Sequence, residues 1–313
     1  MNGARHGSPP QVAVPDATYR LRHRPSPFPG IRNDVAPRHY PRDAMALELP
    51  TSLTPSKVAS FKDCGLAFKF SAIDRLPEPP SPWATKGTLV HRALELLFCE
   101  PPEARTLERA IDKLDHAAAE LATDPEFTGL GLDPEAEALF RAEAEQLVRR
   151  YFRLEDPRTI QPIGLELKLE VRLGTLLLRG IIDRLELDEA GELVVTDYKT
   201  GRAPGIAYEQ SRLGGVHFYA FLCEQFLGRR PARVQLLYLS EPLAIAARPS
   251  AQSIGAFEQR ATAVWKAIER ACDRDDFRPR PSRLCDWCAF RERCPAFATE
   301  SEVALQLVGA EGA

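Results

Sequence analysis

Apolar residues recur at two different spacings along the chain, and the change of spacing divides it into two parts. Between Gly87 and Cys99 the spacing is helical, and the apolar residues are Leu89, Val90, Ala93, Leu94, Leu97 and Phe98. Residues 105–122 and 134–154 show the same spacing and have charged outer faces. An earlier helix is predicted within residues 53–64, where Thr and Ser precede an apolar-periodic stretch. The first part of the folded chain is therefore predicted to be helical.

From Ile163 onward, apolar and polar residues alternate, as they do in strands with one buried face. Predicted strands cover residues 165–173, 176–187 and 192–198, with turns at Gly174–Thr175 and at residues 188–191. A helix over 206–227, a strand over 233–239 and a helix over 253–272 follow. This order predicts an α/β fold, in which a helical insertion at about residues 100–160 precedes a core at about 161–250.

Both ends of the chain differ from this pattern. Residues 1–44 contain eight prolines and seven arginines without apolar periodicity, which predicts a disordered arm. Met45 follows directly and is an alternative first residue. Residues 45–300 are predicted to form the folded domain, and residues 301–313 a flexible tail.

Composition narrows the classes of protein. No apolar run approaches the ~18 residues of a membrane-spanning helix, and the N-terminus has no secretory apolar core, so a cytoplasmic protein without a membrane partner is predicted. The net charge is −3, so the chain has no overall positive charge that would indicate nucleic-acid binding. A local basic groove would still suffice for it.

Two acidic residues lie on strands that a hairpin turn joins. Asp183 is in the middle of the second predicted strand, and Asp197 and Lys199 end the third on one face. Neighbouring carboxylates repel each other unless a divalent cation lies between them, and hard oxygen ligands suit Mg²⁺ or Mn²⁺. Such an ion polarises a phosphodiester, and a lysine beside it offsets developing charge. The alternative is that Asp183 pairs with Arg184 or a surface lysine and that Asp197 merely ends a strand at a turn.

Two further polar residues have open roles. His91 lies on a helix whose apolar side faces the core, where a lone histidine is ordinarily a satisfied polar residue. Together with the acidic hairpin, it is a candidate imidazole ligand for the same ion. Glu166 on the first strand is either an outer-sphere acid or part of that strand's polar face.

Three of the seven cysteines form a tight cluster, Cys285-x-x-Cys288-x₅-Cys294. The odd count and the missing export signal argue against a disulfide framework. Three thiolates so close predict a metal site with a fourth ligand, for which Cys64 is the best candidate; zinc and a [4Fe–4S] cluster both accept four cysteines. A zinc ribbon normally brings two C-x-x-C pairs, and a second pair is not found here. The remaining cysteines, Cys99, Cys223 and Cys272, are predicted to be buried small residues.

Three short motifs carry a resemblance to a known family. Gly87-x-x-x-His91, Gly180-Ile-Ile-Asp183-Arg184 and Asp197-Tyr198-Lys199-Thr200-Gly201 resemble the active-site motifs of the RecB-like exonucleases. These belong to the PD-(D/E)xK nuclease superfamily, which also includes the CRISPR-associated adaptation nucleases. The resemblance covers roughly residues 51–298 and implies a restriction-endonuclease-like core, a central mixed sheet flanked by helices.

The resemblance also implies roles for individual residues. The side chains of His91, Asp183 and Asp197 and the Tyr198 carbonyl would bind Mg²⁺ or Mn²⁺, and Lys199, Asp183 and Asp197 would be catalytic. The cysteine pattern resembles the iron–sulfur branch of the family, in which one cysteine precedes the nuclease motifs and three follow them. It implies a [4Fe–4S] cluster on Cys64, Cys285, Cys288 and Cys294, with zinc as the alternative. The cysteine-cluster segment then spans about residues 278–298.

One departure from the family concerns DNA contacts. The family usually has a Gln four residues before the tyrosine of the following helix, and Gly215 occupies that position relative to Tyr219. Gln210 and His217 are nearby and are candidate substitutes. Candidate DNA contacts are therefore Tyr219, His217, Gln210, Arg280 and Arg283. Trp83, Tyr198, Phe218 and Tyr219 either stack bases or pack in the core.

The sequence therefore predicts a metal-dependent DNA exonuclease that acts at DNA ends or single strands, in repair, recombination or CRISPR-type DNA processing. Two alternatives remain open. One is a non-catalytic iron–sulfur DNA-binding module, which Gly215 favours. The other is a nuclease subunit active only with a helicase or another repair or CRISPR protein. The chain has no P-loop motif, so a helicase would come from another chain.

Overall fold

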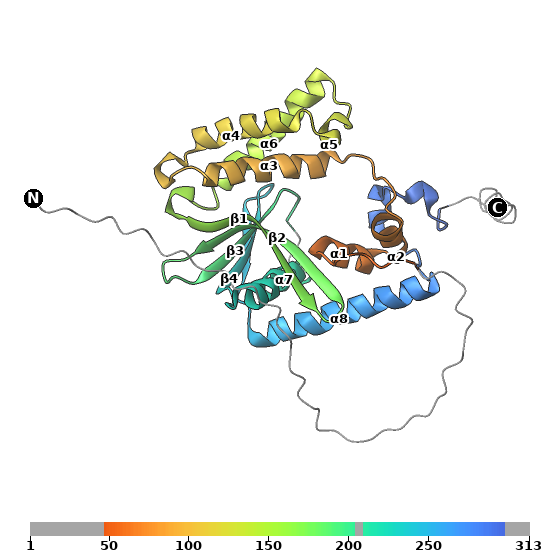
Figure 1. Cartoon of the computed structure of the whole chain (residues 1–313). Helices are drawn as coiled ribbons and strands as arrows, with labels where there is room; N and C mark the ends of the chain where they lie inside the picture. Colours follow the sequence, from red (N-terminus) through yellow and green to blue (C-terminus); the bar gives the residue numbers. More distant parts are fainter. Residues whose placement is uncertain (1–46, 204–208, 298–313) are drawn as a thin grey trace, which may run out of the picture. The chain divides into compact units, whose positions relative to one another are not determined.

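A computed structural model describes residues 47–203 and 209–297, without the side chains of residues 209–214. The predicted arm and tail lie outside the described residues. The centre is a five-stranded sheet in the order β1-β2-β3-β4-β5 (Figure 1). Its strands are β1 (Gln161–Leu173), β2 (Leu176–Leu187), β3 (Leu193–Lys199), β4 (Arg233–Tyr238) and β5 (Leu243–Ala247). Only β3 and β4 pair in parallel, so the sheet is mixed and the predicted α/β class is confirmed.

Helices flank the sheet on both sides (Figure 1). On one side lie α3 (Pro82–Phe98), α4 (Leu107–Leu121), α5 (Pro125–Thr128) and α6 (Pro134–Tyr151); on the other lie α7 (Glu209–Leu227) and α8 (Ala251–Arg274). The short helices α1 (Pro55–Asp63) and α2 (Gly65–Phe68) lie near the C-terminal end of α8. Each side has its own apolar core, one built with α7 and α8 and the other with α3, α4 and α6.

Two elements differ from the sequence expectation. Helix α3 begins at Pro82, before Gly87, because the Ser81 hydroxyl accepts a hydrogen bond from the Ala84 N–H and proline suits the first helical turn. His91 therefore lies in the middle of a long helix rather than near its start. Strand β5 was not predicted, because Leu-Ala-Ile-Ala-Ala has no apolar–polar alternation; it forms by antiparallel pairing with β4.

Helix α7 approaches β2 closely at Gly180 of the Gly-Ile-Ile-Asp motif. A Cβ placed on Gly180 would lie 2.7 Å from Leu222 Cδ1 and 3.4 Å from Tyr219 Cε1. Leu222 is fully buried, so it has little room to move away. The motif glycine therefore lets α7 bring Tyr219 against the strand that carries Asp183.

We expect Gly180→Ala to lower the free energy of unfolding by about 1–3 kcal/mol, because the added methyl overpacks the contact with α7. Urea denaturation followed by circular dichroism measures the change. The matched control is Gly255→Ala in α8, where a Cβ meets nothing within 4 Å among the described residues. That variant should be unchanged or up to about 1 kcal/mol more stable. Equal stability of the two variants would contradict the close approach.

Candidate functional site

Four elements bring acidic and imidazole side chains to one place. His91 comes from α3, Glu166 from β1 and Asp183 from β2, and each offers a ligand atom within 4.8 Å of the other two. The shortest of these contacts that the structure defines joins His91 Nδ1 to Asp183 Oδ2 at 3.6 Å. Asp197 and Lys199 come from β3, beside Asp183. The structure thus brings together the four side chains that the motifs singled out, and it places Glu166, the candidate with two open roles, beside them.

Glu166 lies opposite Asp183 across the β1–β2 hairpin. Its neighbours pair as Leu165 with Arg184 and Leu167 with Ile182, which leaves the two acids facing each other. Like charges directly opposite each other destabilise a sheet. Glu166 also has a backbone φ of +45°, an uncommon conformation for a non-glycine residue inside a strand. Repulsion and backbone strain at one position are typical of a functional site.

Asp197 has a defined environment on β3. The Tyr219 hydroxyl donates a hydrogen bond to Asp197 Oδ1 at 3.0 Å, and Lys199 Nζ lies 2.5 Å from Asp197 Oδ2. Among the described residues, that second oxygen accepts no hydrogen bond of regular geometry although it is buried. The β2–β3 register, in which Arg184 pairs with Thr196, places Asp197 opposite Asp183. One oxygen of Asp197 is thus fixed, and the other has only the lysine beside it.

The peptide units on either side of Tyr198 connect two of the candidate ligands. The Tyr198 N–H donates to Asp183 Oδ2 at 2.6 Å, and the Tyr198 carbonyl lies 3.1 Å from His91 Nε2. If Nε2–H donates to this carbonyl, the neutral ring leaves its lone pair on Nδ1, the nitrogen that faces Asp183. In this structure the carbonyl thus serves as the acceptor for His91. Its predicted role as a metal ligand remains a prediction.

The pKa values reflect crowded, buried acids. Burial and the neighbouring Asp197 raise the pKa of Asp183 to about 8, and burial together with Asp183 raises the pKa of Glu166 to about 6. Burial lowers the pKa of His91, so its imidazole is neutral near pH 7. Burial alone would lower the pKa of Lys199, but Asp197 and Asp183 together raise it. Hard carboxylate oxygens, a neutral imidazole and excess negative charge fit a divalent cation such as Mg²⁺ or Mn²⁺.

A groove runs beside these residues along α3. It has a volume of about 460 Å³ and is lined by Ala84, Gly87, Thr88, His91, Arg92, Glu95 and Glu166. A Cβ at Gly87 would lie 3.2 Å from Thr200 Oγ1, so this glycine allows the segment after Lys199 to approach the helix. Trp83, one residue before the groove begins, is 72% exposed. It is therefore not a packing residue, whereas Tyr198, Phe218 and Tyr219 are buried in the core.

Of the predicted DNA contacts, the structure places Tyr219 at the acids. Tyr219 is buried, and its hydroxyl bonds to Asp197. His217 Nδ1 is buried without a partner in the described part of the chain, and the Gln210 side chain lies outside it. The Arg280 guanidinium donates to the Lys62 carbonyl at 2.7 Å, while Arg283 is exposed.

Gly215, the position of the usual family glutamine, is open. A Cβ at Gly215 would meet no described atom within 4 Å. This departure therefore leaves space at the position, and no described side chain fills it.

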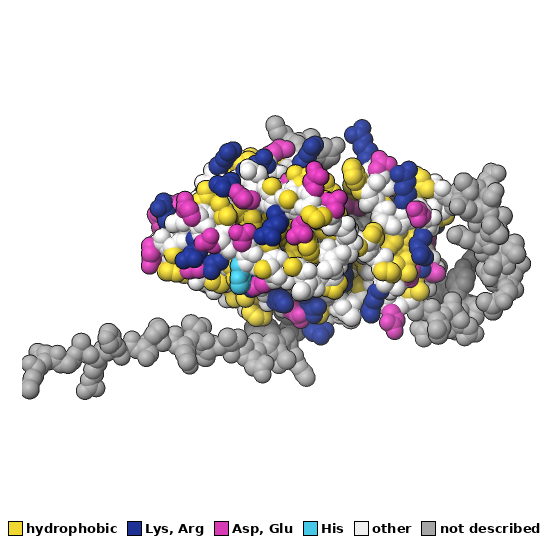
Figure 2. Space-filling view, turned by 90° about the horizontal axis from the view of Figure 1, so that it is seen from above, with side chains coloured by type: hydrophobic (Ala, Val, Ile, Leu, Met, Phe, Trp, Pro, Cys, Tyr) yellow, Lys and Arg dark blue, Asp and Glu magenta, His cyan; other side chains and the backbone are white. Residues whose placement is uncertain are grey.

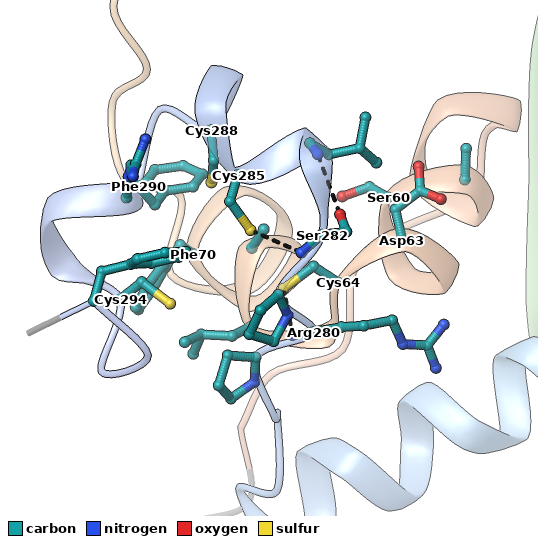
Figure 3. Close-up of a pocket in the computed structure, with 18 of the residues that line it drawn as sticks. Ser60, Asp63, Cys64, Phe70, Arg280, Ser282, Cys285, Cys288, Phe290 and Cys294 are labelled. Carbon is teal, nitrogen blue, oxygen red and sulfur yellow. Dashed lines mark hydrogen bonds between the residues drawn. The ribbon is translucent and has the colours of Figure 1, made fainter.

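Four cysteines line a second cavity, of about 390 Å³ (Figure 3). Cys64 comes from the junction of α1 and α2, and Cys285, Cys288 and Cys294 come from the C-terminal segment. Two sulfur atoms accept backbone hydrogen bonds, Cys64 Sγ from the Arg280 N–H at 3.4 Å and Cys285 Sγ from the Ser282 N–H at 3.3 Å. The four residues predicted as one ligand set thus lie in one cavity.

The other three cysteines lie apart from this cavity. Cys223 and Cys272 are buried, as predicted. Cys99 is exposed, so its predicted burial is wrong. Cys99 is the C-cap residue of α3, directly after Leu97 and Phe98, whose side chains are buried.

Comparisons with known proteins bear on the family and the fold. Residues 52–295 match the family described as the PD-(D/E)XK nuclease superfamily. A relative named Gene 69 protein, from Mycobacterium phage D29, is 27% identical over 169 residues, covering 48% of this chain and 62% of that protein. The match therefore spans less than two thirds of that relative.

Two solved structures resemble the chain at 13% identity. SSO0001 has a TM-score of 0.35, with 82% of this chain and 91% of the other covered. A protein from Eubacterium rectale, named as a candidate exonuclease, has a TM-score of 0.48, with 84% and 94% covered. Within residues 47–203 and 209–297, every helix is too short or too polar to span a lipid bilayer.

The raised pKa of Asp183 predicts a pH-dependent stability of the metal-free protein. A carboxyl whose pKa is about 8 when folded, against an ordinary 3.8, binds its proton more tightly in the folded state. Its contribution to stability is therefore complete below pH 3.8 and is lost as the pH rises towards 8. Asp183→Asn keeps an oxygen for the Tyr198 N–H and removes the buried charge. We expect it to raise Tm at pH 8, by about 2–4 °C for each kcal/mol regained, with a much smaller effect at pH 5, where most of the contribution is still present.

Thermal unfolding with and without Mn²⁺ measures both parts of this expectation. Mn²⁺ should raise Tm of the wild type far more than that of Asp183→Asn, because the variant loses a ligand oxygen. The control is Asp273→Asn on the exposed surface of α8, which should follow the wild type. A Tm at pH 8 that is unchanged by Asp183→Asn would refute the buried repulsion.

Proposed function

The chain belongs to the PD-(D/E)XK nuclease superfamily, and from this premise we propose that it is a metal-dependent DNA exonuclease. One observation carries the proposal, namely the convergence of His91, Glu166 and Asp183 within 4.8 Å beside the Asp197–Lys199 pair. Buried acids that face one another are costly unless a cation or a proton neutralises them. Their placement next to a charged lysine and an open groove supports phosphodiester hydrolysis.

Each residue has a definite part in this chemistry. When bound, Mg²⁺ or Mn²⁺ would polarise the phosphodiester and lower the pKa of a bound water. His91 offers neutral Nδ1, and Asp183, Asp197 and Glu166 offer carboxylate oxygens; the Tyr198 carbonyl is a further candidate ligand. The Lys199 ammonium, held by Asp197, stabilises negative charge on the phosphate. Tyr219 orients Asp197 through its hydroxyl.

The surroundings of the site support a single strand or a DNA end as substrate. Part of the groove along α3 is lined by small residues, Ala84, Gly87 and Thr88, which let a nucleic-acid backbone come close. The exposed ring of Trp83, the residue before Ala84 in α3, offers a stacking surface for a base. Figure 2 shows positive and negative side chains intermingled on the face seen there, without a broad basic field. Binding would therefore rest on the groove and the ion, with Arg280, Arg283 and His217 as candidate contacts.

The cysteine cavity supports an iron–sulfur cluster better than zinc. A zinc ribbon normally brings two C-x-x-C pairs, whereas this sequence has one pair, Cys285 and Cys288, with the single residues Cys64 and Cys294. The 390 Å³ cavity that these four cysteines line has room for a [4Fe–4S] cluster. Its role would be architectural, joining α1 and α2 to the C-terminal segment, because hydrolysis involves no redox step.

A nuclease that works as a subunit of a helicase–nuclease or CRISPR-type complex is the second candidate. The cysteine-cluster segment exposes two large apolar side chains, Leu284 at 55% and Trp287 at 82%. Exposed apolar residues on a cluster-bearing segment are typical of a contact with another protein. A non-catalytic DNA-binding module is the weaker candidate, because His91, Asp183, Asp197 and Lys199 are all present and lie close together.

We expect Lys199→Ala to reduce kcat on end-labelled single-stranded DNA with Mn²⁺ by about 10²–10³-fold, since it removes one charged group that stabilises the transition state. Binding of Mn²⁺, measured by calorimetry, should persist because the carboxylates and His91 remain. Lys266→Ala, which removes an exposed lysine of α8, is the control and should keep full activity. A Lys199→Ala protein with wild-type kcat would rule out this active site.

The cysteines make a separate prediction about cofactor content. The protein purified without oxygen should be brown, absorb near ~400 nm and contain about four iron atoms per chain. Cys288→Ser should lose this absorbance, whereas Cys99→Ser, at the exposed end of α3, should keep it. Metal analysis that finds zinc in place of iron, or equal spectra for the two variants, would overturn the cluster assignment.

A further inference from the structure

An arginine next to the proposed metal site is completely buried. Arg184 follows Asp183 on β2, and its side chain points to the opposite face of the sheet because side chains alternate along a strand. Its guanidinium is 0% exposed and lies over the Phe98 ring of α3, 4.6 Å from the centroid. A buried charge of this kind is stable only when every donor has a partner.

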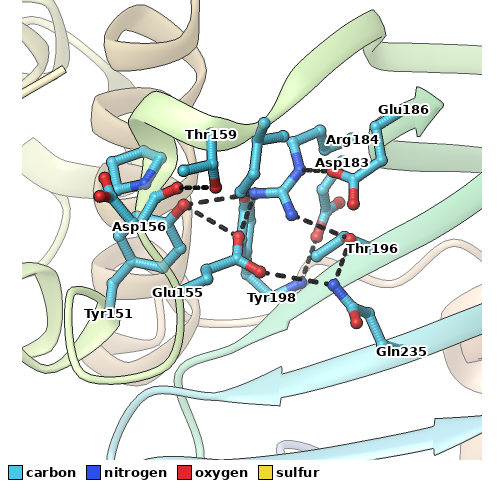
Figure 4. A network of polar contacts seen from close by, with 12 residues as sticks. Tyr151, Glu155, Asp156, Thr159, Asp183, Arg184, Glu186, Thr196, Tyr198 and Gln235 are labelled. Carbon is cyan, nitrogen blue, oxygen red and sulfur yellow. Dashed lines mark hydrogen bonds and ion pairs between the residues drawn. The ribbon is translucent and has the colours of Figure 1, made fainter. Parts of the chain in front are cut away.

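The partners of Arg184 come from several elements (Figure 4). Glu155 Oε1 and Glu186 Oε2 each lie 2.5 Å from the guanidinium. Arg184 also donates hydrogen bonds to the hydroxyls of Tyr198 at 2.8 Å, Thr196 at 3.1 Å and Tyr151 at 3.3 Å. The planar fork of an arginine satisfies such a set, and a lysine does not.

One of these partners, Tyr198, reaches into the metal site. Its hydroxyl accepts from Arg184, while its N–H donates to Asp183 and its carbonyl lies within hydrogen-bond distance of His91 Nε2. Asp197 and Lys199 are its neighbours in sequence. The position of Tyr198 therefore sets the relation between two candidate ligands that come from different elements, α3 and β2.

We propose that Arg184 is a positioning residue, which anchors the Tyr198 hydroxyl and so fixes the backbone that orients His91 and Asp183 around the divalent cation. Arg184 acts from the far face of the sheet and touches neither cation nor DNA. This inference rests on the proposed metal-dependent function of the same site.

Two tyrosines provide a matched pair for the test. Tyr198 and Tyr151 are both buried, and each hydroxyl accepts from Arg184, but only Tyr198 has its backbone in the metal site. We expect Tyr198→Phe to weaken Mn²⁺ binding by about 10-fold or more, as loss of a residue that orients a ligand does. Tyr151→Phe should stay within about twofold of wild type. Calorimetry gives the Mn²⁺ Kd without reference to catalysis, and thermal unfolding compares the two losses of stability.

Arg184→Lys extends the test, since it keeps the charge and loses the fork. It should weaken Mn²⁺ binding as Tyr198→Phe does, and the double variant should show no further loss, because both changes break the same link. Equal Mn²⁺ affinities of Tyr198→Phe and Tyr151→Phe would show that Arg184 has only a structural role. If Arg184→Lys does not fold, the comparison of the two tyrosine variants still tests the positioning role.

Cleavage of single-stranded DNA by the wild type is measured in the same samples. A protein that cleaves DNA while Tyr198→Phe binds Mn²⁺ normally overturns the inference and leaves the nuclease function standing. If the wild type does not cleave DNA but Tyr198→Phe weakens its Mn²⁺ binding, the nuclease function is overturned and the positioning role of Arg184 stands. A wild type that binds no Mn²⁺ overturns both.

Discussion

Carboxylates that face one another on neighbouring strands repel, and burial removes the water that would screen them. Asp183 meets this repulsion from two sides, from Glu166 on β1 and from Asp197 on β3. The protein offsets part of it with the Tyr198 N–H, the Tyr219 hydroxyl and the Lys199 ammonium. The rest appears as a raised pKa of Asp183 and Glu166. Such a cluster is stable in its ionised form only with a cation, which is why the surrounding fold is best explained as a support for one.

That support comes from both faces of the sheet. On one face, Gly180 lets α7 approach so closely that Tyr219 reaches Asp197. On the other, the buried Arg184 joins β2 to Tyr198 of β3 and Tyr151 of α6 through hydrogen bonds, and it packs on the Phe98 ring of α3. His91 arrives from α3 and contacts the Tyr198 carbonyl. Since rigid elements hold functional groups more accurately than loops do, the proposed cation site is built mainly by backbone register and packed helices.

The sequence predicted the parts of the site that depend on local spacing. A hairpin with strand alternation is enough to place Asp183 beside Asp197 and Lys199 on one face. Glu166 was a candidate with two open roles, and counting back from the turn at Gly174–Thr175 pairs it with Asp183. The Tyr219–Asp197 bond and the Arg184 network were not predicted, since both depend on how helices pack across the sheet. Strand β5 was missed because its alanines carry no periodic signal.

The two proposed metal sites differ in what holds them together. The acidic site rests on paired strands and already has its side chains oriented by hydrogen bonds from Tyr198 and Tyr219. The cysteine site is built from short turns of the C-terminal segment and Cys64, with backbone N–H groups directed at two sulfur atoms. Soft thiolates and hard carboxylates select different metals, so the sites do not compete for one ion. Binding at the cysteines would therefore contribute mainly to folding, because a site made of turns gains its order from the metal, whereas binding at the acids would contribute mainly to chemistry.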